Sequence, residues 1–425
     1  MTAHPALGLV DAVASQLADP YTAPLGPRAT SSDRQHLAYG PPGIALLHIE
    51  RAANGLGPWQ RAHDWLAAAT REPFTSGPDS HPFYGVSAFA HALTCAADHI
   101  PGSYQRALNT MDRQIVVDVG CRLDAAHRRI DAGRLPELAE FDTIRGLTGY
   151  GAYLLRRAPR SPTTRAVLDY CVRLTEPVTR DGESLPGWWT ETGPSGSPDD
   201  DRFPGGHANT GMAHGIGGVL ALLALAARIG TVADGHRAAL RTILTWLDRW
   251  QQETGSGAAW PYWVNQGELR TGRLAPFVPR RPSWCYGTAG LARAQQLAAL
   301  ALGDTDRQIE AENALVASLT DPDQLKATMD NGLCHGFAGL AHVAARTADD
   351  AHPSTVGQLR AAIPALLAAV HPPGTDPEFT ATALIQDAER GPGLLDGAAG
   401  TALALLAPST AAPPRSAWDA CLLIA

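Results

Sequence analysis

Several features that mark other classes of protein are missing from this sequence of 425 residues. Its N-terminus, Met1 to Asp19, lacks the basic stretch followed by an apolar core that a secretory signal peptide requires. The longest apolar run, Ile216 to Ala227, ends at Arg228 and falls short of the roughly 18 residues of a membrane span. We therefore expect a cytoplasmic protein without a membrane span, which could still associate with the membrane through a biosynthetic complex.

Positive charge is also scarce. The chain has 34 basic and 42 acidic residues, a net charge of -8, and no basic run, which argues against a nucleic-acid-binding protein. Hydrophobic residues make up 45% of the chain and charged residues 18%, as in a soluble globular protein with a sizeable core. Alternating β-branched patterns that would predict strands are rare.

No two cysteines have the Cys-x-x-Cys spacing, although the chain contains six cysteines. Disulfides are rare in the cytoplasm, so these residues are better interpreted as free thiols, core residues or metal ligands.

What the sequence does have is a repeat. A pair of glycines three residues apart, followed by small and apolar residues, recurs at intervals of 45 to 72 residues. The seven copies begin at Gly40, Gly85, Gly146, Gly215, Gly287, Gly336 and Gly397, and in the second copy Ala88 replaces the second glycine. A single such pair means little, but seven along one chain indicate a repeat architecture.

Each copy is followed by an apolar stretch typical of a buried helix, such as Val219 to Arg228. Amphipathic stretches lie between copies, for example His236 to Gln251 and Arg307 to Leu319. The pattern predicts an all-α fold in which seven helical hairpins close into an α/α toroid, with inner and outer rings of helices. An open helical solenoid is the alternative. In the toroid the glycines would allow sharp turns and close approach of inner helices, and all seven loops would meet at one end.

Two irregular segments, Gly187 to Gly206 and Gln252 to Pro282, are rich in turn-forming residues and precede two of the glycine pairs. We expect them to be loops that line or cover the mouth of the barrel. We find no interdomain linker and predict one domain over residues 1–425.

Three copies of the repeat carry reactive side chains. Cys285 precedes Gly287, and Cys334 and His335 precede Gly336. If the loops converge, these three form a plausible zinc site, because thiolates with one imidazole favour Zn²⁺ over Mg²⁺ or Ca²⁺. Three protein ligands leave a fourth position open, as in catalytic sites. Each residue taken alone could equally be a buried cysteine or a capping histidine.

A zinc ion with two thiolates is suited to holding an incoming thiol as a reactive thiolate. Addition of that thiol to an electrophilic carbon also needs a proton donor, and His214, directly before Gly215, is the best-placed candidate. Asp142 could orient an imidazole or simply cap a helix or pair with Arg145. Arg281 and Tyr286 flank Cys285 and could hold a substrate carboxylate or an enolate oxygen.

At these residues the chain resembles the lanthipeptide (lantibiotic) cyclase family, in its stand-alone form. The resemblance covers essentially the whole chain and rests on the repeats, on Ala213-His214-Gly215, on Trp284-Cys285-Tyr286-Gly287 and on Cys334-His335-Gly336. It implies an α/α toroid that binds zinc through two cysteines and a histidine, here Cys285, Cys334 and His335. It also places His214 and Asp142 at acid/base positions, and Arg281 and Tyr286 at further active-site positions.

The resemblance implies a reaction as well. The substrate would be a precursor peptide with dehydrated Ser and Thr, whose cysteines add to dehydroalanine or dehydrobutyrine to form lanthionine or methyllanthionine. The chain has no room for a dehydratase or kinase domain, so a separate dehydratase and an exporter are the expected partners. A relative that joins glutathione to dehydrated residues shares the zinc motif and stays an alternative.

Other toroidal helical enzymes and a non-catalytic scaffold are the remaining alternatives. The α/α glycosidases need two opposed carboxylates. Terpene cyclases need aspartate-rich metal motifs, and the only cluster, Asp199-Asp200-Asp201, is followed by Arg202-Phe203 where a further aspartate would be required. A zinc prenyltransferase is the nearest enzymatic rival. A non-catalytic peptide-binding scaffold would be expected to have lost a ligand or His214, and all are present.

Overall fold

The computed structural model describes residues 5–23, 33–71, 73–197 and 200–425. The first four residues of the N-terminal segment and Asp199 of the aspartate run lie outside these ranges. That residues 1–425 form one domain stays a prediction.

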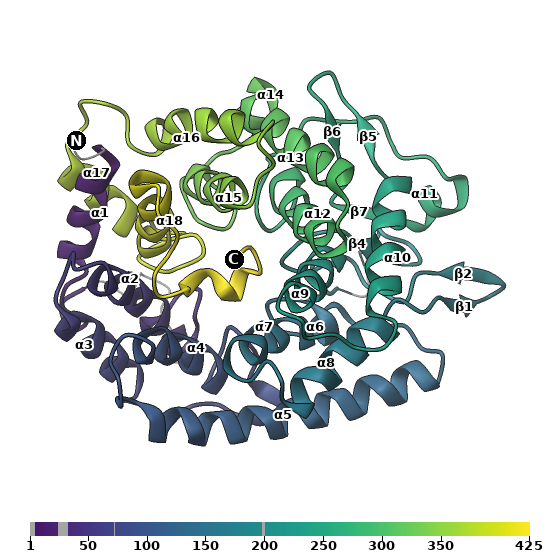
Figure 1. Ribbon diagram of the computed structural model, residues 1–425, viewed down its shortest axis with the longest axis horizontal. Coiled ribbons are helices and arrows are strands. Elements are labelled where there is room, and N and C mark those ends of the chain that lie inside the picture. Colours follow the sequence, from purple (N-terminus) through teal and green to yellow (C-terminus); the bar gives the residue numbers. More distant parts are fainter. Residues whose placement is uncertain (1–4, 24–32, 72, 198–199) are drawn as a thin grey trace.

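The architecture is a closed ring of inner helices surrounded by outer helices (Figure 1). Each inner helix contacts the next one along the chain, and the last contacts the first, which closes the ring and excludes the open solenoid. The inner helices are α2 (Pro41–Ala53), α4 (Val86–Ala97), α7 (Leu147–Arg157), α9 (Ile216–Arg228), α12 (Thr288–Leu302), α15 (Phe337–Asp349) and α18 (Ala398–Thr410).

Each of the seven inner helices begins directly after the first glycine of a repeat, as the sequence predicts. These helices are buried on nearly all sides; all twelve residues of α4 are buried. The outer helices are amphipathic instead. In α10 (His236–Arg249) the buried residues recur at intervals of three and four, which is the spacing of one helical face.

The outer ring differs from seven successive hairpins in one respect. Six inner helices pack against the outer helix that follows them, but α18 packs against α1 (Pro5–Gln16), from the opposite end of the chain. The last hairpin is therefore formed by the two ends together, because α18 is followed only by the C-terminal segment. The other outer helices are α3 (Trp59–Ala69), α5 (Gln105–Asp131), α8 (Pro162–Arg173), α10, α13 (Thr305–Thr320) and α16 (Val356–Val370).

The remaining elements are short. The helices are α6 (Leu138–Phe141), α11 (Gln266–Thr271), α14 (Pro322–Lys326), α17 (Pro377–Ile385), and the 3-10 turns η1 (Asp33–Gln35), η2 (Gly77–Asp79) and η3 (Trp418–Leu422). The strands are β1 (Val178–Arg180), β2 (Glu183–Leu185), β3 (Trp189–Thr190), β4 (His207–Asn209), β5 (Gln252–Glu253), β6 (Ala258–Ala259) and β7 (Trp263–Asn265). In the described residues no helix is long and apolar enough to cross a bilayer.

The two segments predicted to be irregular contain part of these strands. Strands β3, β4 and β7 form a three-stranded antiparallel sheet that joins the two segments, with Ala208 paired to both Trp189 and Val264. The expectation of simple loops is wrong here. Strands of two or three residues are too short to produce an alternating pattern, so long-range pairing rather than local sequence creates them.

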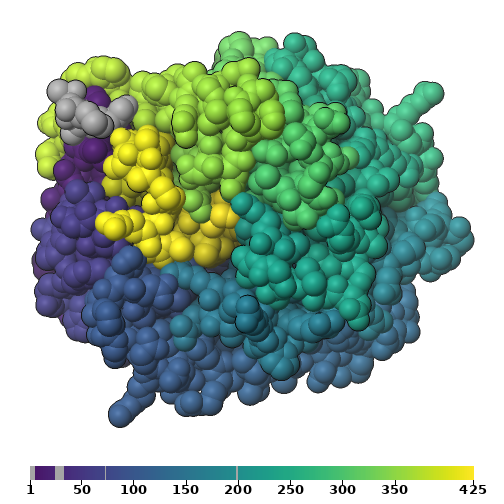
Figure 2. All heavy atoms as spheres, viewed as in Figure 1, coloured from purple at the N-terminus to yellow at the C-terminus, as the bar shows by residue number. Residues whose placement is uncertain are grey.

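The C-terminal segment fills the centre of the ring. In Figure 1 the chain end lies inside the ring, and Figure 2 shows the C-terminal residues, in yellow, in the middle of that face. Side chains of inner helices hold the segment: Glu50 of α2 accepts hydrogen bonds from both N–H and O–H of Ser416, and Arg293 of α12 donates to the carbonyl of Ile424. The interior of the toroid is therefore a packed core.

Most of the repeat glycines are needed because a Cβ atom at these positions would collide with nearby backbone atoms. In six copies a Cβ on the second glycine would lie against the carbonyl oxygen six residues earlier, in the loop of its own repeat; at Gly43 the distance to the oxygen of Leu37 would be 2.1 Å. A neighbouring repeat also comes near, since the Cβ of Leu394 would lie 2.9 Å away. The predicted close approach is thus mainly between each helix and its own loop. A positive φ requires glycine only at Gly85 and Gly287, with φ of 74° and 112°.

A glycine-to-alanine substitution is expected to have opposite effects on stability at two positions. Gly43→Ala should destabilise the protein by about 1–3 kcal/mol, because the added methyl group overlaps a backbone carbonyl. Gly120→Ala, within α5 and with no atom within 4 Å of the added methyl, should stabilise it by about 0.5–1 kcal/mol through helix propensity. Urea unfolding of both variants checks the signs, and a neutral Gly43→Ala would contradict the packing argument.

Candidate metal and active site

Hydrogen bonds between neighbouring loops hold the mouth of the barrel together. Most are backbone bonds, and they link each loop that enters an inner helix to the loop of the next repeat. The donor and acceptor pairs are Leu37 N to Phe83 O, Thr143 N to Ala213 O, Met212 N to Cys285 O, Cys285 N to Cys334 O, Cys334 N to Leu395 O and Leu394 N to Ala38 O. His81 Nδ1 and the Ile144 carbonyl, 3.1 Å apart, join the second loop to the third. The loops thus form a closed circle.

This circle places one side chain per repeat at equivalent positions, directly before the first glycine. The seven residues are Tyr39, Tyr84, Arg145, His214, Tyr286, His335 and Asp396. His214, Tyr286 and His335 were selected from the sequence for their chemistry, but the position that all seven residues share was not recognised. The residue before each repeat glycine is therefore a signal that could have identified Asp396.

Asp142 and His214 form a pair across two repeats. Asp142 Oδ2 lies 2.6 Å from His214 Nδ1, while Oδ1 accepts the backbone N–H groups of Arg145 and Gly146 at 2.6 and 2.9 Å. The carboxylate is 1% exposed and can only accept, so it holds the proton of the imidazole on Nδ1 and leaves Nε2 for other chemistry. Asp142 therefore orients the imidazole of His214 and also fixes the loop in front of α7, although the side chain does not cap that helix.

Cys285 and Cys334 are brought together by adjacent loops. The thiol of Cys334 donates a hydrogen bond to the sulfur of Cys285, and Ser283 provides a second one. Together these hydrogen bonds outweigh the effect of burial, which would raise the pKa, and lower the pKa of Cys285 to about 6. The same bond raises the pKa of Cys334, because it holds that proton in place. The pair therefore loses a first proton easily, as a site that binds metal through thiolates requires.

His335 lies between two carboxylates. Asp330 Oδ2 is 2.6 Å from its Nδ1 and Asp396 Oδ1 is 3.1 Å from its Nε2. Burial alone would lower the pKa of His335, but these two hydrogen bonds outweigh it and raise the pKa to about 10. A carboxylate on Nδ1 is the arrangement that fixes the tautomer of metal-binding histidines and directs Nε2 towards the ion.

The donor set fits a metal ion. Sγ of Cys334, a ring nitrogen of His335 and a carboxylate oxygen of Asp396 all lie within 4.8 Å of one another. Cys285 lies outside this tightest group, but its sulfur is within hydrogen-bonding reach of Cys334. Two thiols, one oriented imidazole and one carboxylate are ligands typical of zinc.

Tyr286 and Arg281 border the same mouth. The hydroxyl of Tyr286 accepts a hydrogen bond from Asn209 Nδ2 at 3.1 Å, and its ring centroid lies 6.3 Å from that of His214. Burial raises the pKa of Tyr286 well above its ordinary value, so the phenol keeps its proton and can donate it in a hydrogen bond. The positive charge of Arg281 helps to lower the pKa of Cys285, after the hydrogen bonds from Cys334 and Ser283.

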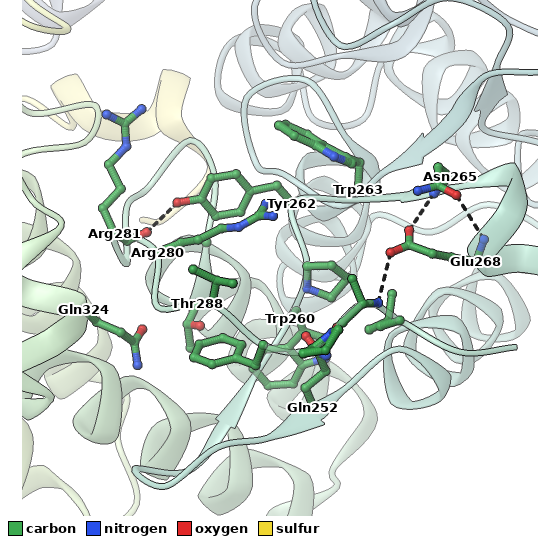
Figure 3. A pocket seen from close by; sticks show the side chains of 17 residues that line it. Gln252, Trp260, Tyr262, Trp263, Asn265, Glu268, Arg280, Arg281, Thr288 and Gln324 are labelled. Carbon is green, nitrogen blue, oxygen red and sulfur yellow. Dashed lines mark hydrogen bonds between the residues drawn. The ribbon is translucent and has the colours of Figure 1, made fainter. Parts of the chain in front are cut away.

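A cavity of about 250 Å³ lies beside this mouth, on the segment that was predicted to line it. Figure 3 shows aromatic and charged side chains around it and the Arg281 side chain extending away from it. The hydroxyl of Tyr262 donates to the Arg281 carbonyl at 2.8 Å, and the ring of Tyr262 lies 5.5 Å from that of Tyr286. Arg280 stacks over Tyr262, 5.0 Å from its centroid. The segment therefore reaches the candidate site, as expected.

Among the residues selected from sequence, the structure groups Cys285, Cys334 and His335 on two neighbouring loops and pairs His214 with Asp142. Three residues that contact selected residues were missed: Asp330 and Asp396, which contact His335, and Asn209, which contacts Tyr286. Asn209 and Asp330 each lie six residues before a repeat glycine, a regularity that only the loop geometry makes meaningful.

The closed ring of helices and the cluster of thiols, imidazoles and carboxylates at one end define a toroidal all-α protein with a candidate metal centre at the mouth. The chain belongs to the lanthionine synthetase C-like family, whose profile matches residues 31–423.

A curated relative and a solved structure show the similarity. The nisin biosynthesis protein NisC of Lactococcus lactis subsp. lactis is 24% identical over 247 residues, and the match spans 56% of this chain and 56% of that relative. The solved structure of nisin cyclase superimposes with a TM-score of 0.71 and covers 93% of both chains at 19% identity. That structural likeness supports the same toroidal fold.

Proposed function

We propose that this protein is a zinc-dependent lanthipeptide cyclase. Its substrate would be a precursor peptide with dehydrated Ser and Thr, and its products lanthionine and methyllanthionine rings. The observation that carries the proposal is the convergence of Cys285, Cys334 and His335 beside the His214–Asp142 pair, in a chain of the lanthionine synthetase C-like family. The names of both similar proteins, a nisin biosynthesis protein and a nisin cyclase, support this chemistry.

Cys285, Cys334 and His335 would hold the zinc ion. When bound, it supplies Lewis acidity that keeps the thiol of a substrate cysteine deprotonated near neutral pH. The guanidinium of Arg281 adds positive charge near Cys285, which also favours thiolate.

The reaction is a conjugate addition. The thiolate sulfur forms a bond to Cβ of dehydroalanine or dehydrobutyrine, and the electron pair of the C=C bond moves onto the neighbouring carbonyl as an enolate. A proton then adds to Cα. The thiol hydrogen is thereby replaced by the S–C bond and a new C–H bond forms, so the peptide keeps its mass.

The residues around the mouth match the needs of this reaction. His214, held by Asp142 through Nδ1, takes up at Nε2 the proton that the substrate thiol loses and delivers it to Cα. Tyr286 is a protonated phenol and Arg281 a cation, so both can stabilise the oxygen of the enolate. The stabilisation would be strong because the side chains are partly buried.

The proposed function also sets partners and location. A dehydratase would supply the dehydrated residues, and an exporter would carry the finished peptide out. The cytoplasm is the compartment in which the thiols of enzyme and substrate stay reduced, and all six cysteines of the chain are unpaired in the structure. Association with the membrane would come through a complex with these partners.

The test uses a synthetic peptide that carries a dehydroalanine and a cysteine a few residues apart, incubated with the zinc-loaded protein. Because cyclisation leaves the mass unchanged, the readout is the loss of one thiol that can be alkylated. His214→Ala should lower the rate by about 10²–10⁴-fold, the usual contribution of a general acid or base, with zinc content unchanged.

His352→Ala serves as the control, because His352 is half-buried after the C-terminal end of α15 and its imidazole hydrogen-bonds to Ser354 rather than to any residue of the candidate site. A wild-type rate equal to the spontaneous one would contradict the cyclase. Glutathione joined to the peptide, seen as an increase in mass, would instead favour the glutathione-adding alternative.

A further inference from the structure

Four rings lie together in the loops of the first and second repeats, on a part of the mouth that has been given no role so far. They belong to His36, Tyr39, His81 and Tyr84, which form an aromatic platform. The ring centroid of His36 lies 4.7 Å from that of Tyr39 and 5.5 Å from that of His81. The ring of Tyr84 lies 6.0 Å from His36 and 5.6 Å from His81. The four rings therefore form one continuous cluster.

The backbone fixes the aromatic platform. Leu37 N donates to the carbonyl of Phe83 at 2.8 Å, which joins the two loops, and Ala38 N donates to Nδ1 of His36 at 3.0 Å, which holds that ring. Burial lowers the pKa of both His36 and His81 to about 4, so both imidazoles are neutral at pH 7. The aromatic platform thus presents uncharged rings.

Tyr39 is the member of the aromatic platform that reaches solvent. It is 48% exposed, whereas the other three residues are half-buried. Its ring packs beside the fixed ring of His36. An exposed ring held by a second ring can stack against a flat group of a ligand at little cost in side-chain entropy. Tyr39 is therefore the ring that a ligand at the mouth could contact.

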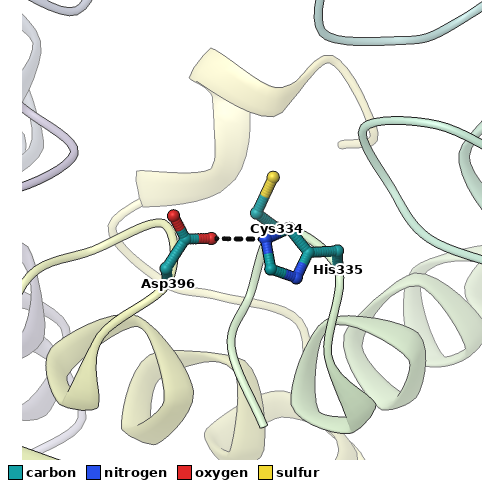
Figure 4. Close-up of side chains that lie close together, drawn as sticks. All are labelled: Cys334, His335 and Asp396. Carbon is teal, nitrogen blue, oxygen red and sulfur yellow. Dashed lines mark ion pairs between the residues drawn. The ribbon is translucent and has the colours of Figure 1, made fainter. Parts of the chain in front are cut away.

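One side of the aromatic platform adjoins the candidate metal ligands. A backbone hydrogen bond of 2.7 Å from Leu394 N to Ala38 O joins the loop of Tyr39 to the loop of Asp396. Figure 4 shows the Asp396 carboxylate beside two of the candidate metal ligands. Burial, and after it the neighbouring Asp396 and Cys334, raise the pKa of Tyr39. The exposed ring is therefore close to the place where a substrate thiolate would be held.

The other side adjoins the residues that would transfer the proton. His81 Nδ1 lies 3.1 Å from the carbonyl oxygen of Ile144, in the loop of the third repeat. The same loop carries Asp142, whose carboxylate orients His214. The aromatic platform thus lies between the loop beside the metal ligands and the loop that orients the proton donor.

A dehydrated residue of the peptide has the shape and polarity that such a surface suits. In dehydroalanine and dehydrobutyrine the C=C bond is conjugated with planar amide groups, so the residue is flat and uncharged. It can lie face to face with an aromatic ring, whereas a saturated residue, with a tetrahedral Cα, cannot. In the proposed reaction its Cβ must also meet the thiolate and its Cα must meet the proton donor. The aromatic platform adjoins both.

We propose that the aromatic platform binds the dehydrated residue of the peptide, whose planar C=C group stacks on the ring of Tyr39. The loops of the fifth and sixth repeats would then hold the nucleophile, and those of the first and second repeats the electrophile. Tyr39 would select dehydrated residues over saturated ones. This inference deepens the proposed function and rests on it.

The test is a binding measurement that requires no reaction. Two dye-labelled peptides without cysteine differ at one residue, which is dehydrobutyrine in one and its saturated counterpart, 2-aminobutyrate, in the other. Fluorescence anisotropy follows their binding to the zinc-loaded protein. Wild type should bind the dehydrated peptide about two- to tenfold more tightly, the size of one stacking contact, and Tyr39→Ala should bind both peptides equally.

Two control variants accompany Tyr39→Ala. Tyr39→Phe keeps the ring without the hydroxyl and should keep the preference for the dehydrated peptide. Tyr104→Ala removes another tyrosine that packs beside a histidine, His63, with a centroid distance of 6.5 Å. Tyr104 precedes α5, beyond the end of α4 that is remote from the mouth, so this variant should also keep the preference. Unchanged zinc content in all three variants shows that the metal site is intact.

The outcomes are distinct. A preference lost in Tyr39→Ala and kept in both controls supports the proposal. A wild-type protein without preference, whether it binds both peptides or neither, overturns it, and so does a Tyr39→Ala variant that binds both peptides more weakly by the same factor. If wild type closes rings but shows no preference, only this inference fails. If wild type closes no rings, the proposed function fails.

Discussion

Replacement of Cys285 or Cys334 by alanine is expected to remove the metal ion and abolish ring formation. Each change leaves a site with a single thiolate, and the two sulfurs act together because their loops are joined by the bond from Cys285 N to Cys334 O. Lewis-acid activation is worth several kcal/mol, so the rate of thiol addition should fall by about 10³-fold or more. Metal content by elemental analysis and thiol alkylation of the dehydrated peptide measure the two effects.

The control for these variants is Cys121→Ala. Cys121 is an exposed cysteine on α5, so its loss should leave both metal content and rate as in wild type. Wild type should contain about one zinc per chain. Zinc that persists in either Cys285→Ala or Cys334→Ala would refute the ligand assignment. Far-ultraviolet circular dichroism shows whether the variants keep their helices, which matters because Cys285 is part of the core and Cys334 packs against it.

Asp419→Ala is expected to cost about 3–5 kcal/mol of unfolding free energy, the cost of breaking a buried ion pair by removing one partner. Asp419 is fully buried in the C-terminal segment at the centre of the ring, 3.0 Å from His342 Nε2 and 3.1 Å from Arg346 Nε. Without the carboxylate, the largely buried Arg346 loses its nearest counter-charge. Urea unfolding followed by tryptophan fluorescence measures the effect.

The same ion pair gives a dependence on pH. Burial alone would raise the pKa of Asp419, but Arg346 and His342 outweigh it and lower the pKa to about 2. The folded value lies below the unfolded value of about 3.9, so the stabilisation is present above that pH and is lost as the pH falls towards 2. The difference between wild type and Asp419→Ala should therefore shrink over this range.

Asp349→Ala is the matched control, because Asp349 pairs with the same Arg346 but from the surface, at 3.5 Å and with 41% of its side chain exposed. An exposed pair of this kind is worth about 0.2–1 kcal/mol. Equal losses in the two variants would contradict the view that the buried C-terminal segment holds the ring together.

The fold was predictable because its signal is local and repeated. Each inner helix needs a glycine at its start and apolar residues on all sides, and these requirements appear in the sequence seven times. Two features were not accessible in this way. The seventh outer helix is α1, from the other end of the chain, and the three-stranded sheet pairs β3 and β7 with β4 across two segments. Both depend on contacts between distant residues that leave no periodic trace.

The candidate site was likewise predictable only in part. Cysteine and histidine before a repeat glycine are unusual enough to be selected from sequence, and His214, Cys285, Cys334 and His335 were found in this way. Asp396 was not, because aspartate is common in loops and its position gains meaning only once the loops are known to meet. Its 3.1 Å contact with His335 joins two repeats that are 61 residues apart.

By itself the sequence determined the helical repeat and the chemical type of the candidate site. The spacing of apolar residues specifies helices, and glycine can be replaced at few tightly packed positions. Only the tertiary structure decided which carboxylate faces which imidazole and how the ring closes. It also placed the C-terminal segment in the centre. Such contacts arise from backbone hydrogen bonds between loops and from burial of charge, and any residue type with the right distance and charge can satisfy them.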